Sequence, residues 1–166
     1  MVRVRKIQRG FTLIEVMIVI AIIGITSALV FVSLATGKTG RLLERSSREV
    51  IAGLREAQNY AVSGRSTAIN ENNTSFGVQI VSATAYNVIS SSGTVSSYSL
   101  KEGVNFASGV TTLGFMVPRG DVTVAGVPLA AGASYRIDLS KSGSTVHICL
   151  YQSGRIVENG GNATCP

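Results

Sequence analysis

A long uncharged stretch near the start of the chain limits most strongly how this sequence can fold. Residues 16–37 (VMIVIAIIGITSALVFVSLATG) contain no Asp, Glu, Lys or Arg. As an α-helix they would be about 33 Å long, enough to cross a hydrocarbon core of roughly 30 Å. A core helix that is apolar on every side is unusual in a protein of 166 residues. We therefore expect residues 11–37 to form a transmembrane helix.

The ten residues before this helix are strongly basic. They include Arg3, Arg5, Lys6 and Arg9 and no acidic residue. Without these four charges the formal net charge falls from +6 to about +2, so the high pI mainly reflects this segment. General binding of polyanions is the alternative interpretation. By the positive-inside rule, the basic end stays in the cytoplasm. The rest of the chain is then expected outside a single pass through the inner membrane.

Three interpretations of this N-terminal region compete. A secretory signal could be cut after Ala35, but its apolar region would exceed the usual 7–15 residues or so. A plain uncleaved anchor is the second interpretation. Neither needs the acidic Glu15, which would cost roughly 2.5–3.5 kcal/mol at mid-bilayer and less near the edge. The third interpretation rests on the residues around Glu15.

Residues 6–25 (KIQRGFTLIEVMIVIAIIGI) resemble the prepilin cleavage and methylation motif of the type IV pilin and pseudopilin superfamily. Gly10 occupies the position before the cut, Phe11 the position after it, and Glu15 the fifth position of the mature chain. The resemblance implies that a prepilin peptidase/methyltransferase removes the leader, residues 1–10, and methylates the new amino group of Phe11. One departure is Val32, which stands where many major pilins have Pro.

The resemblance also implies how Glu15 would act. Its carboxylate would pair with the amine of Phe11 on a neighbouring subunit, which favours docking and helps to set the register. The partners implied are other pilin or pseudopilin subunits and the inner-membrane platform of the assembly machine. The alternative is that Glu15 reaches the membrane interface without a partner.

Residues 38–64 predict an amphipathic second half of the helix, ending at Gly64 as C-cap. The apolar stripe consists of Leu43, Val50, Leu54, Ala57 and Ala61. The charged face alternates Arg41, Arg45, Arg48 and Arg55 with Glu44, Glu49 and Glu56. We interpret it as a solvated or subunit-facing surface, with contact to a polyanion as the alternative.

Residues 65–166 predict an antiparallel β head, because they are rich in Val, Thr, Ser and Tyr with frequent Gly. Strand-like runs occur at Phe76–Val81, Tyr86–Ile89, Val95–Leu100, Leu113–Val117, Val122–Ala125, Tyr135–Leu139, Val146–Tyr151 and Arg155–Val157. The last two runs flank a short turn and predict a hairpin. With the long helix packed on this head, the expected fold class is α+β.

Two segments of the head resemble the GspH/FimT-like branch of minor pilins and minor pseudopilins. They are residues 54–65 (LREAQNYAVSGR) and 147–157 (HICLYQSGRIV). The resemblance implies a minor subunit of a type IV pilus or a type II secretion pseudopilus. Some FimT-like members bind DNA through a Gly-Arg-x-Arg segment. Here Glu158 follows Gly154-Arg155-Ile156-Val157 and the second basic residue is missing, so Arg155 is only a weak candidate for contact with nucleic acid. A DNA-uptake receptor or adhesin is the alternative function.

Cys149 and Cys165 are the only cysteines. If they pair outside the cytoplasm, they tie the tail to the late hairpin and stabilise it by about 3 kcal/mol. Two free buried thiols are the alternative, and pairing is common in the family that the chain resembles. The single His147 lacks the further ligands of a zinc site, and no pattern predicts an enzyme, a metal site or a cofactor.

Overall fold

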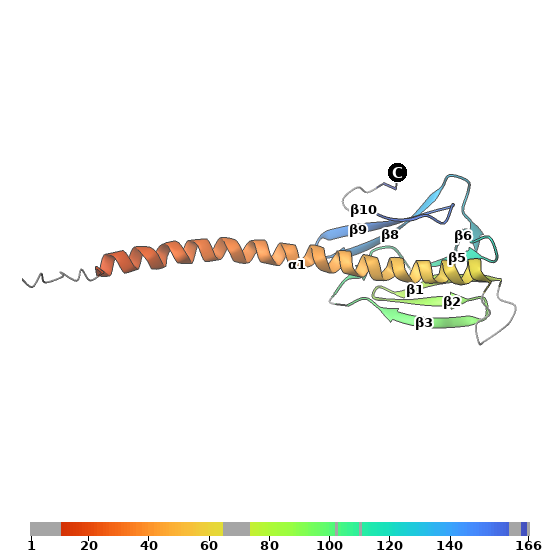
Figure 1. The fold of residues 1–166 in the computed structure, drawn as a ribbon, viewed down its shortest axis with the longest axis horizontal. Helices are drawn as coiled ribbons and strands as arrows, with labels where there is room; N and C mark the ends of the chain where they lie inside the picture. Colours follow the sequence, from red (N-terminus) through yellow and green to blue (C-terminus); the bar gives the residue numbers. More distant parts are fainter. Residues whose placement is uncertain (1–10, 65–73, 102, 110, 160–163, 166) are drawn as a thin grey trace, which may run out of the picture. The chain divides into compact units, whose positions relative to one another are not determined.

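The structure is a computed structural model, and it describes residues 11–64, 74–101, 103–109, 111–159 and 164–165 (Figure 1). The chain forms two units, residues 1–38 and 39–166, and each is described by itself. The predicted leader, residues 1–10, lies outside the description. The predicted transmembrane helix, residues 11–37, lies partly outside it, because the side chains of 29–37 are not described.

Helix α1 runs from Leu13 to Ser63. Its described residues in the first unit expose their side chains, as expected for a segment without a sheet to pack against. In the part of the chain that the structure describes, no helix combines the length and the apolar character that a membrane crossing requires.

In the second unit, residues 39–63 of α1 are amphipathic as predicted. All five predicted stripe residues are at most 1% exposed: Leu43, Val50, Leu54, Ala57 and Ala61. Their spacing of three, four and seven residues puts them on one side of the helix. The helix ends at Ser63. The next residue, Gly64, has a φ of 60°, the left-handed conformation that commonly ends helices.

The head contains two antiparallel sheets in its described part. The six-stranded sheet has the order β3-β2-β1-β5-β6-β7. Its strands are β1 (Ser75–Ser82), β2 (Ala85–Ser90), β3 (Gly93–Ser99), β5 (Thr112–Met116), β6 (Asp121–Val124) and β7 (Val127–Pro128). The four-stranded sheet has the order β10-β9-β8-β4. Its strands are β4 (Asn105–Phe106), β8 (Ser134–Lys141), β9 (Ser144–Tyr151) and β10 (Ile156–Asn159).

This architecture confirms the predicted α+β class, and each predicted strand run overlaps an observed strand. The predicted hairpin is β9–β10, with Ile156 opposite Leu150. Two details were not predicted. The head divides into two sheets, and the short strands β4 and β7 extend one sheet each.

One hydrophobic core joins the helix to both sheets. The six-stranded sheet contributes Phe76, Val78, Ile80, Leu113 and Phe115, and the four-stranded sheet contributes Ile137, Leu139, Ile148 and Leu150. Strand β8 alternates as expected for a half-buried strand, because Ile137 and Leu139 are buried while Arg136 is exposed. Each fully buried side chain of this size contributes roughly 1.5–3 kcal/mol. The stripe of α1 is therefore the element that holds the two sheets in one head.

The turn between β9 and β10 packs directly on α1. The Gln58 side-chain amide donates a hydrogen bond to the Gly154 carbonyl oxygen at 3.0 Å. Gly154 has a φ of 79°, and a Cβ atom at this position would collide with the Gln58 amide nitrogen. Glycine is therefore favoured here by its backbone conformation, and an added Cβ atom would also force the Gln58 amide to move.

Cys149 and Cys165 form a disulfide, with their Cα atoms 5.7 Å apart. This excludes the alternative of two free thiols. Cys149 is fully buried on β9, and near it the Asn159 side-chain amide donates to the Thr164 carbonyl oxygen at 3.1 Å. The described end of the chain is thus fastened to the four-stranded sheet at two points.

Candidate assembly site at the start of the helix

Thr12 and Glu15 define where α1 begins. The Thr12 side-chain oxygen accepts a hydrogen bond from the Glu15 backbone amide at 3.3 Å, and the Thr12 carbonyl accepts one from the Val16 amide. Thr12 is therefore the N-cap of the helix. The sequence Thr-x-x-Glu is that of a capping box. This pattern was visible in the sequence, but the prediction singled out Glu15 and left Thr12 aside.

Glu15 lies in the first turn of α1 with an exposed side chain. It borders a shallow hollow on the side of the helix, lined also by Phe11, Val16, Val19 and Ile20. None of the ion pairs between described residues includes Glu15. The partial positive charge of the helix N-terminus favours an acid at this position. The carboxylate is accordingly presented beside an apolar surface, open to a cation from another molecule.

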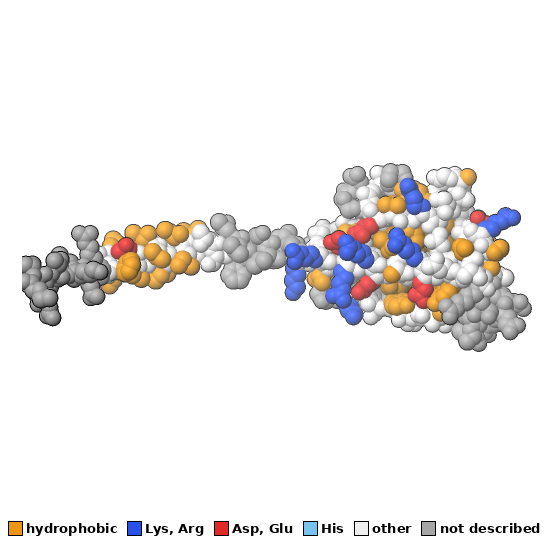
Figure 2. Space-filling view, in the orientation of Figure 1, with side chains coloured by type: hydrophobic (Ala, Val, Ile, Leu, Met, Phe, Trp, Pro, Cys, Tyr) orange, Lys and Arg blue, Asp and Glu red, His pale blue; other side chains and the backbone are white. Residues whose placement is uncertain are grey.

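The surface around Glu15 is apolar on every side of the helix, as Figure 2 shows for the face in view. Phe11 is 83% exposed, Leu13 78% and Ile25 68%. Thr26 is a polar residue within this apolar segment. Its hydroxyl donates to the carbonyl oxygens of Ile22 and Ile23 in the same helix. A continuous apolar surface of this kind marks contact with lipid or with other apolar helices.

The predicted site residues fall into separate groups. Phe11 and Glu15 lie in the described part of the first unit, while Gly10 lies outside the described residues. Cys149, Cys165 and Arg155 lie in the second unit. The guanidinium carbon of Arg155 is 4.3 Å from the centre of the Tyr151 ring, a cation–π contact that fixes this side chain against its own strand pair.

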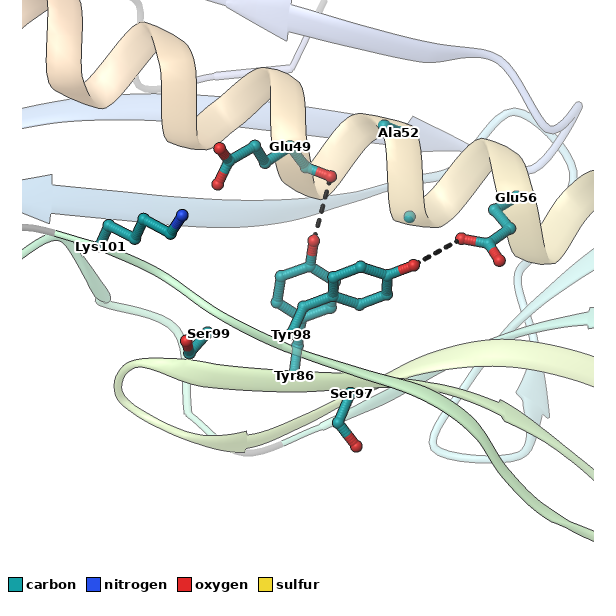
Figure 3. A pocket seen from close by; sticks show the side chains of 9 residues that line it. Glu49, Ala52, Glu56, Tyr86, Ser97, Tyr98, Ser99 and Lys101 are labelled. Carbon is teal, nitrogen blue, oxygen red and sulfur yellow. Dashed lines mark hydrogen bonds between the residues drawn. The ribbon is translucent and has the colours of Figure 1, made fainter.

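The head has a groove between α1 and strands β2 and β3, which the sequence analysis did not identify (Figure 3). The Tyr86 and Tyr98 rings are stacked there, with centroids 5.2 Å apart. The Tyr86 hydroxyl donates to the Glu49 carbonyl oxygen at 3.1 Å, and the Tyr98 hydroxyl donates to the Glu56 carboxylate at 3.1 Å. The tyrosines thus connect the sheet to α1 by hydrogen bonds as well as by packing.

Burial raises the pKa of Tyr86 well above its ordinary value, and the nearby Tyr98, Glu49 and Glu56 add to this effect. Tyr86 therefore keeps its proton and remains a hydrogen-bond donor at neutral pH. The Glu56 carboxylate also accepts from the Tyr60 hydroxyl at 2.9 Å. The Glu56 carboxylate thus binds two phenol hydroxyls, of which that of Tyr98 holds α1 against strand β3. In this group of side chains no nucleophile is paired with a base.

His147 has a structural partner. Its Nδ1 atom lies 2.7 Å from an Asp138 carboxylate oxygen, and Arg136 lies 2.9 Å from the same oxygen. Asp138 and His147 face each other across strands β8 and β9. Within the described residues, no group of three or more His, Cys, Asp or Glu side chains could hold a metal ion.

Comparison with known protein families gives a match at the start of the chain. Residues 5–31 match the family model described as the prokaryotic N-terminal methylation motif. The match supports a protein of the type IV pilin and pseudopilin class, and this motif is a structural signal and not a catalytic domain. No curated protein and no solved structure matches the chain.

Proposed function

We propose that this protein is a minor pilin-like subunit that assembles into a type IV pilus or a type II secretion pseudopilus. A prepilin peptidase/methyltransferase would cut between Gly10 and Phe11 and methylate the Phe11 amine. The main support is the methylation motif in residues 5–31. It comes together with a helix that begins directly after the proposed cut and exposes an acid in its first turn.

In this proposal, cleavage and Glu15 serve the same step. Residues 11–37 anchor the precursor in the inner membrane with the head outside. An ionised carboxylate surrounded by apolar side chains or lipid is unfavourable unless it is paired. The amine that cleavage creates on Phe11 of a neighbouring subunit provides the opposite charge. Insertion into the growing filament then exchanges an unpaired charge for an ion pair.

The second unit suits a position outside the cytoplasm. Disulfides form and persist in oxidising compartments, and Cys149–Cys165 fastens the end of this chain to its sheet. The resemblance of residues 54–65 and 147–157 to the GspH/FimT-like branch favours a minor subunit. Its partners would be related pilin or pseudopilin subunits and the inner-membrane assembly platform.

Mass spectrometry of the protein purified from membranes tests the processing step. We expect the mature N-terminus to be N-methylated Phe11. The variant Gly10→Val should keep the leader, because the residue before the cut is changed while the apolar segment is not. An N-terminus at Thr36 would instead indicate a secretory signal, and a wild-type chain still beginning at Met1 would indicate an uncleaved anchor. Either result rejects the proposal.

A further inference from the structure

The solvent-facing side of α1 in the head carries two separate lines of charge. One line, here called the arginine flank, consists of Arg41, Arg48 and Arg55, and the other, the glutamate flank, consists of Glu49 and Glu56. Within each line the residues are seven apart, which is almost two helical turns, so each line follows one side of the helix. Figure 2 shows Lys and Arg side chains interspersed with Asp and Glu side chains on the face of the head over which α1 runs.

The flanks border the grooves beside α1. Arg48 and Arg55 line a groove together with Ile156 and Glu158 of β10, and Glu56 reaches this groove as well. Glu49 and Glu56 line the groove of the stacked tyrosines, with Lys101 on its rim. Because Arg48 and Glu49 are consecutive, the two flanks lie roughly a quarter of a turn apart on the exposed side of α1. Glu158 of β10 lies beside the arginine flank and Lys101, which follows β3, lies beside the glutamate flank.

The midline between the flanks is formed by Arg45, Ala52 and Asn59, again at intervals of seven residues. All three are exposed. Ala52 is at the centre of this line and carries only a methyl group. A second backbone can therefore approach the helix most closely at Ala52.

The pairs within the helix leave part of this charge uncompensated. Arg48 pairs with Glu44, and Arg45 pairs with Glu49 at 3.5 Å. The side chains of both arginines are largely exposed. Exposed pairs of this kind are weak. Arg41 and Arg55 take part in none of the ion pairs between described residues.

We propose that this face docks on the same face of a second copy of the chain, with the two helices parallel. A two-fold axis parallel to the helices places the arginine flank of each copy opposite the glutamate flank of the other. Arg48 and Glu49 differ by one residue, a rise of about 1.5 Å, so they meet at the same level. Arg55 and Glu56 do likewise. The symmetry makes each pair occur twice.

Charge also selects against the antiparallel arrangement. A two-fold axis perpendicular to the helices would bring arginine flank against arginine flank. Like charges in contact disfavour such a complex and help to define orientation. In the parallel pair Arg45 is the only charged residue of the midline that meets its own copy, and Glu49 of the same helix already pairs with it.

The inference concerns the head and rests on its charge pattern, whereas the proposed function rests on the N-terminal site. If the proposed function holds, a shared membrane anchor would orient all copies in the same direction and favour the parallel pair. The two proposals can therefore fail independently.

Cysteine crosslinking of the full chain in membranes tests the docking. The variant Ala52→Cys should form a covalent dimer on oxidation, as should Arg45→Cys and Asn59→Cys, each with its own copy. The control is Val127→Cys, an exposed residue on β7, which reports random collision. An antiparallel pair centred on residue 52 would instead link Arg45→Cys to Asn59→Cys when the two are mixed, and that result overturns the proposal.

Charge reversal tests the recognition. In the Ala52→Cys background, Arg48→Glu alone or Glu49→Arg alone should lower the dimer yield roughly tenfold, since two attractive pairs become repulsive. Co-expression of the two reversed variants should restore the yield in mixed dimers. Both positions are exposed or half-buried, and the Glu49 atom that holds Tyr86 is its backbone oxygen, so the fold is preserved.

Three outcomes would reject this pairing. They are an Ala52→Cys yield equal to the Val127→Cys control, no rescue on mixing, or a crosslink only to a different protein, which would assign the face to another subunit.

The same measurement in a Glu15→Lys background separates the two proposals. Loss of filaments with an unchanged crosslink leaves the head pairing intact, and loss of the crosslink with normal processing at Phe11 leaves the proposed function intact.

Discussion

At the scale of single residues, Glu15 has two separable roles. Its backbone amide is capped by Thr12, and its charge is favoured at the N-terminus of α1. Both effects act within one chain. The proposed ion pair with Phe11 acts only between chains and requires the negative charge. A substitution that keeps the shape and removes the charge therefore leaves the backbone cap in place, and removes the charge–dipole interaction together with the proposed ion pair.

We expect Glu15→Gln to insert into the membrane and to be processed, but to enter filaments at least tenfold less well than wild type, because a neutral amide cannot pair with the amine. Membrane fractionation measures insertion, and the yield of sheared filaments measures assembly. Glu15→Lys should assemble no better, since it places two positive charges together.

Thr12→Val is the matched control. It removes the cap, at a cost of about 1 kcal/mol to the helix start, and leaves the Glu15 charge in place. This variant should still assemble. If Thr12→Val stops assembly while Glu15→Gln assembles normally, then Glu15 acts through capping and the intermolecular pair is wrong.

At the scale of secondary-structure elements, the turn of the β9–β10 hairpin is joined to α1 by a side-chain hydrogen bond, in addition to the core contacts of β9. The Gly154 carbonyl accepts from Gln58, and a Cβ atom at 154 would displace the Gln58 amide from this position. This contact explains why a Gly precedes Arg155. It also positions the hairpin independently of the disulfide.

Gly154→Ala should lower the free energy of unfolding by about 1–3 kcal/mol, from a left-handed backbone and the collision with Gln58. Gly143→Ala is matched to it, with a φ of 80° against 79° but nothing within 4 Å of the added methyl group. Urea unfolding of the full chain in detergent measures both. Equal losses would mean that the Gln58 contact contributes nothing.

Local patterns predicted much of the fold because they depend on neighbours in sequence. The stripe from Leu43 to Ala61 and the alternation in β8 needed only helix and strand periodicity. Strand β4 could not be found in this way. Asn105 and Phe106 form two residues of strand only because Ser140 and Leu139 lie beside them. The division into two sheets is equally non-local.

The candidate site shows the same limit. Glu15 was predicted because an acid in an apolar segment is conspicuous, and residues 5–31 match the expected motif. The Tyr98–Glu56 bond joins residues 42 positions apart, and no local pattern announces it. The charge flanks became visible only when α1 was known to bury one side and expose the other.

At the scale of the whole molecule, the head is held by one core and by one covalent bond near its end. The disulfide joins Cys165 to a residue that is fully buried on β9. It closes a loop that includes the turn packed on α1. The end of the chain therefore depends on the bond, while the core does not.

We expect the double variant Cys149→Ala with Cys165→Ala to fold and to lose about 2–4 kcal/mol of unfolding free energy. Thermal unfolding in detergent measures this loss. Reductant should produce a similar change in wild type and none in the double variant. An unchanged double variant would show that the bond does not stabilise the head.

The stacked tyrosines also give the molecule an intrinsic optical reporter. The chain has no tryptophan and five tyrosines, so its near-ultraviolet circular dichroism above the phenylalanine region comes from phenol rings and the disulfide. Tyr86 and Tyr98 are close enough for their transitions to couple, and both hydroxyls are bonded to α1. Separation of the helix from the six-stranded sheet would break both hydrogen bonds and expose the two rings, which would change this signal. Docking of α1 can thus be followed spectroscopically in the unlabelled protein.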